Sequence, residues 1–264
     1  MKKGAVALLI LIAGALAYFV ITAGSQVQPP PPPSNTPPPA ETKPPAVLNT
    51  GTTTPTAAKT PAIKSYEINY SHVITVYIGD IALKMSGWTA EGVGEYGNYS
   101  FGKLVLNIPP HGPVEITYKA ATEGRTAYVV TCASGQCQAE AGPANYTIFL
   151  KLRGESRAER GSCSHLGQAG TLYEERGRIS PEVLSQILGG LPANGTGFFT
   201  AVVCEAGGVP LTTSANIYLN VTLYGQVLTI KLVVESSAVS ISAYNSTRYK
   251  LLLTEAKAAQ RAGA

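Results

Sequence analysis

The stretch "ANIYLNVTLYGQVLTIKLVVE", residues 215–235, contains two runs in which apolar and polar residues alternate. The apolar residues that share a face are Ile217, Leu219, Val221 and Leu223 in the first run, and Leu228, Ile230, Leu232 and Val234 in the second. A period of two is typical of a half-buried β-strand, and a short turn at 224–226 joins the two runs as a hairpin. The stretch predicts an antiparallel sheet that is apolar on one face.

The same alternation occurs in "SYEINYSHVITVYIGD", residues 65–80. Its apolar face consists of Tyr66, Ile68, Tyr70, Ile74, Val76 and Ile78. Further strands are predicted at 104–108, 114–118, 128–132, 146–152, 198–204 and 239–243. The fold class is therefore mainly β, with an antiparallel sheet that forms either a half-barrel or a sandwich and carries one or two short helices.

Two helices are expected. In "SPEVLSQILGG", residues 180–190, Ser180 is placed to cap the helix, Pro181 to start it and Gly189 to end it. A second helix, "RYKLLLTEAKAAQRAGA", closes the chain at 248–264. Two placements of the first helix stay open: over a curved sheet as a lid, or at one end of a packed sandwich.

The chain begins with an apolar segment, and residues 1–25 are interpreted as a transmembrane signal anchor. Lys2 and Lys3 are basic flanks of the kind that stay on the cytoplasmic side, so the rest of the chain is expected outside. Cleavage after Ala17 or Ala23 is the competing interpretation. A pilin-like precursor is a further one, although the prolines that follow would end the long helix of a filament subunit.

Residues 26–62 are rich in Pro and Thr, with twelve of the chain's nineteen prolines between Pro29 and Pro61. Such a composition builds no core and predicts a disordered, extended linker. The remaining residues, 63–264, are enough for a sizeable extracytoplasmic β-rich domain. The net charge of +4 comes largely from lysines near the start of the chain, so no nucleic-acid surface is expected.

The asparagines also favour a location outside the cytoplasm for residues 63–264. Six of the ten precede a residue and then Ser or Thr: Asn69, Asn98, Asn145, Asn194, Asn220 and Asn245. This pattern is the acceptor site for N-glycosylation outside the cytoplasm. Chance accumulation in a Thr-rich β protein is the alternative explanation.

The four cysteines are expected to form two disulfides. Cys132 and Cys137 flank a four-residue loop, which leaves Cys163 and Cys204 to pair with each other. Other pairings stay open, but two disulfides fit an oxidising exterior. A metal site built from the cysteines would need C-x-x-C pairs, and a thiol redox centre would need one; the sequence has none.

The catalytic residue types are sparse. Asp80 is the single aspartate, and His72, His111 and His165 are the only histidines. An aspartate dyad and an EF-hand loop therefore cannot be built. Cys163 and His165 are too far apart on a strand for a nucleophile pair, and Glu174 and Glu175 fit a solvated face. We expect no enzyme, no cofactor and no metal.

The order "TAYVVTCASGQCQAE", then "SPEVLSQILGG", then "FFTAVVCEAGGVPLTTSANIYLNVTLYGQVLTIKLVVESSAVSI" resembles the carrier fold of LolA and LppX-like lipoprotein-binding proteins. The resemblance covers residues 65–244 at most and rests on element order and alternation. It implies a half-barrel whose concave apolar face holds a lipid or another apolar ligand. The Pro-rich linker and the sequons depart from the carriers and argue against free shuttling of cargo.

Two functions follow as hypotheses. The first is a membrane-tethered, non-enzymatic module that binds lipid or another apolar ligand outside the cytoplasm. Its expected ligand face consists of Ile217, Leu219, Val221, Leu228, Ile230 and Leu232. The second is a structural or adhesive glycosylated cell-surface protein, either pilin-like or associated with the envelope.

Overall fold

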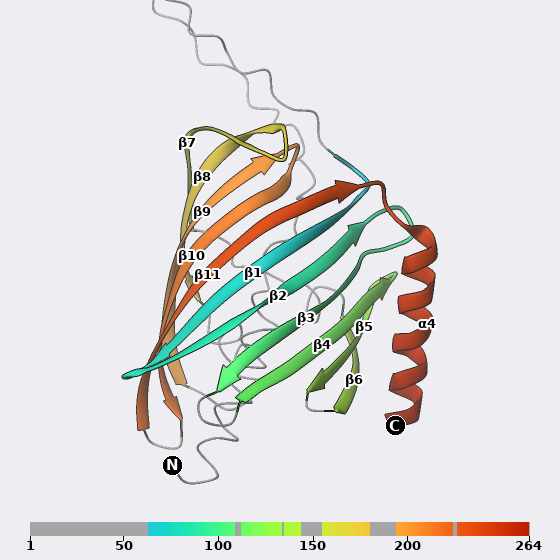
Figure 1. Cartoon of the computed structure of the whole chain (residues 1–264), viewed down its shortest axis with the longest axis horizontal. Helices are drawn as coiled ribbons and strands as arrows, with labels where there is room; N and C mark the ends of the chain where they lie inside the picture. Colours follow the sequence, from blue (N-terminus) through green and yellow to red (C-terminus); the bar gives the residue numbers. More distant parts are fainter. Residues whose placement is uncertain are drawn as a thin grey trace, which may run out of the picture.

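The computed structural model describes residues 63–108, 112–133, 135–143, 155–179, 194–223 and 226–263. They form one curved antiparallel sheet of eleven strands with a helix packed against it (Figure 1). The expected segments 1–25 and 26–62, the strand at 146–152 and the helix at 180–190 lie outside these residues. Within them, no helix is both long and apolar enough to span a membrane.

The first six strands form a meander, as do the last five. Their bounds are β1 (Tyr66–Ile78), β2 (Ile81–Val93), β3 (Tyr99–Ile108), β4 (Gly112–Glu123), β5 (Thr126–Ala133), β6 (Gln136–Pro143), β7 (Ser156–His165), β8 (Gln168–Ile179), β9 (Asn194–Ala206), β10 (Val209–Leu223) and β11 (Gln226–Ser242). The helix α4 (Ser246–Gly263) follows.

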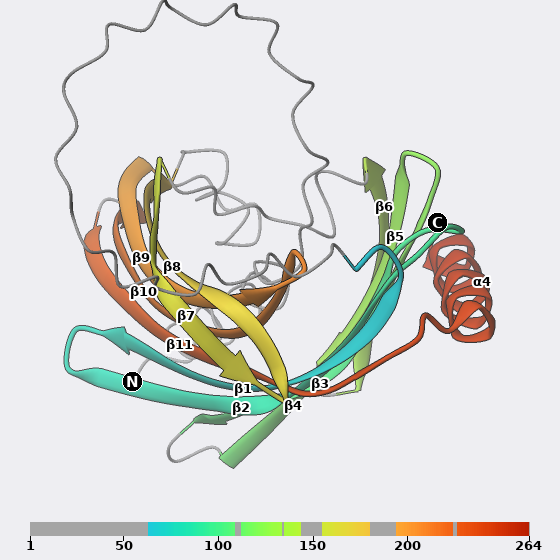
Figure 2. The same cartoon turned by 90° about the horizontal axis from the view of Figure 1, so that it is seen from above.

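The strand order is β6-β5-β4-β3-β2-β1-β11-β10-β9-β8-β7. The two meanders therefore meet at β1 and β11, which pair in antiparallel fashion. Figure 2 shows that the sheet curls, so that it has a concave and a convex side. Among the described residues there is a single open antiparallel sheet, so the expected mainly β, antiparallel fold is confirmed, and these residues contain no second sheet of a sandwich.

The β10–β11 hairpin has the register that the alternating pattern predicts. Ile217 lies opposite Leu232, and Leu219 lies opposite Ile230. The last pair before the turn is Leu223 with Gln226. Both apolar runs therefore lie on the same side of the sheet, because directly paired residues share a face.

Two sequence predictions need correction. Residues 239–243 are not a separate strand, because β11 runs through them to Ser242. Asn69 pairs with Ser240 and Tyr70 with Ala238, so Val239 is the extra residue of a β-bulge that shifts the apolar phase. The C-terminal helix is also not short: α4 has 18 residues and begins at Ser246.

Strands β2, β7 and β8 were not predicted from the sequence. In β2, Gly87 and Gly92 interrupt the apolar alternation. In β7 almost every residue is exposed, so the strand has no apolar period. Hydrogen bonding to neighbouring strands in the sheet stabilises these segments where local propensity does not.

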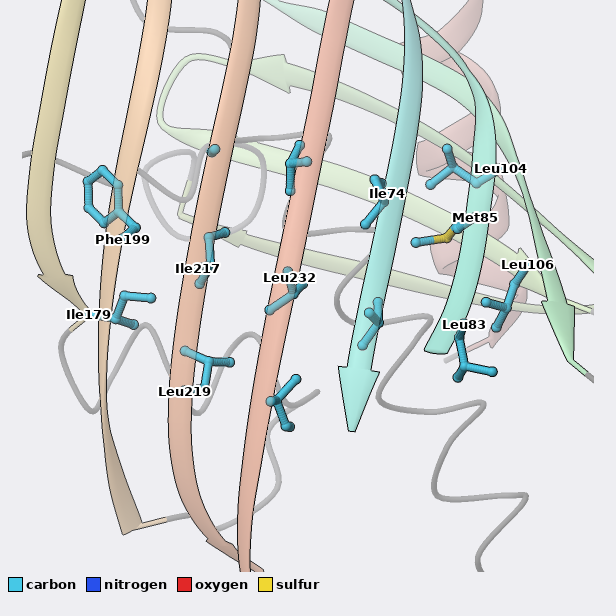
Figure 3. Packing of buried hydrophobic residues seen from close by; sticks show 14 of the residues in the cluster. Ile74, Leu83, Met85, Leu104, Leu106, Ile179, Phe199, Ile217, Leu219 and Leu232 are labelled. Carbon is cyan, nitrogen blue, oxygen red and sulfur yellow. The ribbon is translucent and has the colours of Figure 1, made fainter. Parts of the chain in front are cut away.

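We call the concave side of the sheet the inner face. Its largest buried apolar cluster draws side chains from eight strands, β1 to β4 and β8 to β11. Tyr66, Ile68 and Tyr70 of β1 lie on the same face and belong to a second cluster. Figure 3 shows ten residues of the largest cluster labelled: Ile74, Leu83, Met85, Leu104, Leu106, Ile179, Phe199, Ile217, Leu219 and Leu232. Each lies on alternate positions of its strand, which is the arrangement of a sheet with one apolar face.

The helix α4 lies on the opposite, outer face, beside β3 to β6 (Figure 2). Tyr249 and Leu252 of the helix pack against Tyr99 and Ala121 of the sheet. The helix starts at a capping residue, Asn245, whose Oδ1 accepts a hydrogen bond from the Arg248 backbone N–H at 2.9 Å. The described helix therefore covers the outer face over β3 to β6 and does not cover the inner face.

Candidate ligand-binding face

The structure brings the six expected ligand-face residues together at the centre of the inner face. Ile217, Leu219 and Val221 of β10 lie opposite Leu232, Ile230 and Leu228 of β11. Five of the six are buried, and Leu228 is half-buried at the edge of the cluster. Their role in holding a ligand remains a prediction.

The apolar surface is much wider than these two strands. Toward one side it continues through Phe199 of β9 to Ile179 of β8, and toward the other it reaches Leu104 and Leu106 of β3 (Figure 3). The sheet has one layer in the described part of the chain, and its helix is on the other side. An apolar face of this extent is suited to hold an elongated apolar group.

Polar side chains lie on the same face beyond one end of the apolar cluster. They are His72 of β1, Thr89 and Glu91 of β2, Ser100 of β3 and Ser236 of β11, and we call them the polar row. The pairs Ser236 with His72 and Glu91 with Ser100 are direct cross-strand neighbours. Since β2 has no register shift against β1 or β3, Glu91 lies on the same side as Leu83 and Met85.

His72 is the centre of a hydrogen-bonded group in this row. Its Nδ1 is 2.7 Å from Ser236 Oγ, and its Nε2 is 2.7 Å from Thr89 Oγ1. Both ring nitrogens are thus occupied by hydroxyl groups. Burial lowers the pKa of His72 to about 4, because an imidazolium would lose its hydration there. The ring is therefore neutral at neutral pH.

Glu91 differs from its neighbours. Only 4 % of the residue is exposed, yet its carboxyl group has no hydrogen bond or ion pair with any described residue. Burial raises its pKa to about 8, because a desolvated carboxylate is unfavourable. The carboxyl group therefore mostly keeps its proton at pH 7 and is able to donate a hydrogen bond.

The tyrosines around Glu91 add hydroxyl groups but no charge. Tyr70 donates a hydrogen bond to the Pro210 carbonyl at 2.7 Å. On the other side, Ser100 Oγ and the Tyr118 hydroxyl are 2.7 Å apart. Burial, and secondarily the nearby Glu91, raise the pKa of Tyr66 and of Tyr70. All of these groups are uncharged at neutral pH.

The inner face ends in a charged group on the β7–β9 side. Arg157 Nε is 3.1 Å from Glu175 Oε1, and Arg157 Nη2 is 2.6 Å from Glu205 Oε2. The guanidinium also lies 3.7 Å from the ring centre of Tyr173. Burial is the main cause that raises the pKa of Glu175. Arg157 is thus paired with a glutamate on each of two neighbouring strands, which links β7, β8 and β9 at this edge of the sheet.

The two disulfides are those expected from the sequence. Cys132 and Cys137 join β5 to β6 across the hairpin, and Cys163 joins β7 to Cys204 of β9. Beside the second one, His165 Nε2 lies 2.6 Å from the Ala238 carbonyl. His165 therefore fixes the tip of the β7–β8 hairpin against β11, and Cys163 is not a free thiol.

Four of the six sequon asparagines have described side chains: Asn69, Asn98, Asn220 and Asn245. Asn220 is exposed, and the others are half-buried. Asn69 Nδ2, the atom that would carry a sugar, donates a hydrogen bond to Ser240 Oγ at 2.8 Å. Glycosylation at these sites stays a prediction, as it does at Asn145 and Asn194.

The polar row was not predicted from the sequence. Alternate positions of β2 are Leu83, Met85, Gly87, Thr89 and Glu91, and this period would have placed Glu91 on the apolar face had the strand been recognised. The expected absence of metal and of catalysis stays a prediction. Among the described residues, no three His, Cys, Asp or Glu side chains are grouped to hold a metal ion.

No known protein family matches the chain, and no curated protein is significantly similar to it in sequence. Similar solved structures include a DUF1329 family protein from Desulfovibrio piger ATCC 29098, with 11% identity and a TM-score of 0.27 over 70% of this chain and 90% of that chain. Mycobacterium tuberculosis lipoprotein LppX has 9% identity and a TM-score of 0.27 over 64% of this chain and 84% of that chain.

LprF from Mycobacterium bovis has 12% identity and a TM-score of 0.26 over 63% of this chain and 84% of that chain. LppX-like lipoproteins are thus among the structural neighbours, as the resemblance read from the sequence implies. At these TM-scores the likeness establishes neither the fold nor the function of this chain. The function is therefore inferred from the sheet itself.

Proposed function

We propose that this chain is a non-enzymatic binding module for a lipid or another apolar ligand, which lies against the inner face of the sheet. The observation that carries the proposal is a one-layer sheet whose concave face is apolar across eight strands, while the described helix packs on the convex face. A sheet needs a second layer over its apolar face. A lipid chain is an occupant with the chemistry to supply part of it.

The energetics favour an alkyl or acyl chain over a polar ligand. Burial of apolar surface contributes roughly 25 cal/mol per Å², or about 0.8 kcal/mol per methylene group. The contacts of Ile217, Leu219 and Leu232 are dispersive and impose no direction, so they tolerate chains of different structure. Affinity would then grow with chain length, and selectivity would come from polar groups elsewhere on the face.

We further propose that the module works outside the cytoplasm, held to the membrane by residues 1–25 and away from it by residues 26–62. Two disulfides support an oxidising compartment. A tethered module of this kind receives or presents its ligand near the membrane surface.

The outer face favours a second candidate, a structural or adhesive surface protein. Phe198 and Tyr218 stack with ring centres 4.8 Å apart, and Lys231 Nζ lies 5.5 Å from the Tyr218 ring and 5.8 Å from the Tyr77 ring. Phe198 is 49% exposed. Aromatic residues are enriched at protein interfaces relative to the rest of the protein surface.

Purification of the full chain with matched Val→Thr variants tests the first proposal. Val221→Thr with Val234→Thr places two hydroxyls on the inner face, and Val73→Thr with Val202→Thr makes the same change on exposed positions of the outer face. We expect apolar molecules extracted from the native chain to fall severalfold in the inner pair and to stay unchanged in the outer pair. Equal recovery from both pairs, or none from the native chain, would overturn the proposal.

A further inference from the structure

The polar row contains one buried group that has no hydrogen-bond partner among the described residues. His72 is bonded on both ring nitrogens, and Ser100 is bonded to Tyr118. Glu91 is as deeply buried as they are, but its carboxyl group has no partner in the described part of the chain. Buried polar groups without partners are rare in folded proteins and need an explanation. A ligand that supplies the missing hydrogen bond provides one.

We propose that Glu91 binds the uncharged polar end of an amphiphile, such as a hydroxyl or ester group, whose apolar tail lies on the inner face of the sheet. The inference rests on the proposed function and adds the class of ligand. Glu91 and Met85 lie on the same side of β2, six residues apart, which corresponds to about 20 Å along a strand. Head and tail of one molecule would therefore contact the same strand.

The residues between these two points leave the inner side of β2 without bulky groups. Gly87 has no side chain, and the side chain of Thr89 is small and hydrogen-bonded to His72. On the neighbouring strand, Gly102 pairs with Thr89. The side chain of Leu104 on β3 lies over Gly87, where its Cδ2 is 2.9 Å from the position that a Cβ would take. A tail along β2 would therefore contact Leu104 between the Met85 end and the Glu91 end.

The charge balance favours an uncharged head. Tyr66 and Tyr70 on β1, which lie near Glu91, are neutral at pH 7 because burial raises their pKa, and Ser100 on β3 carries no charge. No Lys or Arg is among the buried residues of the described part, so an anionic head would have no counter-charge here. A cationic head would need Glu91 to ionise where burial opposes it. A protonated carboxyl group instead donates to a neutral oxygen.

Photolabelling of the full chain, held in solution by an amphipathic polymer, tests this assignment. The probe is a dodecanol that carries a diazirine near its hydroxyl group, and the competitors are unlabelled dodecanol, dodecylammonium and dodecyl sulfate. The readout is the labelling of the tryptic peptide 85–103, which contains Glu91. The variants are Glu91→Leu, which removes the donor, and Glu91→Gln, which keeps a donor in nearly the same shape.

We expect dodecanol to compete best, and its half-maximal concentration to rise about three- to tenfold in Glu91→Leu but to change little in Glu91→Gln, as the loss of one hydrogen bond predicts. Retained disulfides and an unchanged circular dichroism spectrum show that each variant is folded. Labelling with equal competition by all three heads would overturn the headgroup assignment and leave apolar binding intact. Stronger competition by dodecylammonium than by dodecanol would overturn the assignment of an uncharged head group and indicate a cationic one. No labelling of any inner-face peptide would overturn both proposals.

Discussion

His72 and Thr89 lie on adjacent strands and are joined by a buried hydrogen bond of 2.7 Å between His72 Nε2 and Thr89 Oγ1. Together with the 2.7 Å contact from His72 Nδ1 to Ser236 Oγ, this bond ties β2, β1 and β11 together through side chains. The two meanders of the sheet meet at β1 and β11. The imidazole therefore strengthens the junction between them.

The first prediction concerns stability in mild acid. The pKa of His72 is about 4 in the folded chain and about 6.5 in the unfolded one. Between these two values the imidazole is protonated in the unfolded chain and neutral in the folded chain. The free energy of unfolding therefore falls as the pH drops from about 6.5 to about 4, by on the order of 3 kcal/mol for this group. We expect His72→Gln to remove this slope in urea unfolding curves, whereas His165→Gln keeps it. An unchanged slope in His72→Gln would contradict the assignment.

The second prediction has the opposite sign. Glu91 has a pKa of about 8 in the folded chain and about 4.3 in the unfolded one. Its contribution to stability is fully present below about pH 4 and is lost as the pH rises to about 8. Tyr66 and Tyr70, which face it from β1, stay protonated over this range because their pKa values are raised.

Glu91→Gln should therefore raise the free energy of unfolding at pH 7, by on the order of 2 to 4 kcal/mol, and abolish this part of the pH dependence. Urea unfolding of the ligand-free chain between about pH 5 and pH 8 measures the effect. Glu115→Gln, at an exposed position on β4, is the control. A Glu91→Gln variant less stable than the native chain at pH 7 would show that the carboxyl group is ionised and paired.

The third prediction concerns the base of α4. Glu67 is buried, accepts a hydrogen bond from the Tyr99 hydroxyl and is paired with Arg248 in the first turn of the helix. Arg248→Ala leaves that carboxylate without its cation and should lower the free energy of unfolding by about 1 to 3 kcal/mol. Lys257→Ala, which breaks the ion pair with exposed Glu123, should lower it by less than about 1 kcal/mol. Equal losses in thermal or urea unfolding would contradict this ranking.

The fourth prediction compares the two disulfides. Cys163 and Cys204 close a long loop, with a sequence separation of 41, whereas Cys132 and Cys137 are 5 apart. In the chain-entropy model the long loop contributes about 4 kcal/mol and the short one about 2 kcal/mol. Double Cys→Ala variants of each pair, unfolded in urea, should differ in this order. Amide exchange should also rise in the β7–β8 hairpin tip only when the long bridge is absent.

The sequence predicted the parts of this fold in which the alternation of residues is regular. Ile217 to Leu232 and Tyr66 to Ile78 lie as their period of two requires, and the β10–β11 hairpin joins the runs where expected. It could not predict β7, whose side chains are nearly all exposed and whose position depends on pairing with β8. Nor could it predict the bulge at Val239, because a single extra residue depends on the partner strand.

The candidate site was predicted only in its apolar part. Leu219 and Ile230 follow from periodicity alone. Glu91 was missed because the glycines on either side of it in β2 hide the strand, and because a glutamate is ordinarily assigned to solvent. Its place on the inner face follows from the pairing of β2 with β1 and β3, in which it lies opposite Ile68 and Ser100.

The pairing of β1 with β11 also constrains how the protein is made. The first strand of the sheet hydrogen-bonds to the last, which is synthesised more than 140 residues later, at Gln226–Ser242. During synthesis the first meander therefore presents an open apolar edge at β1, including Ile68 and Ile74, with no strand yet available to pair with it. The complete sheet should therefore form only after β11 has been synthesised. A chain that ends before β11 should aggregate or be degraded.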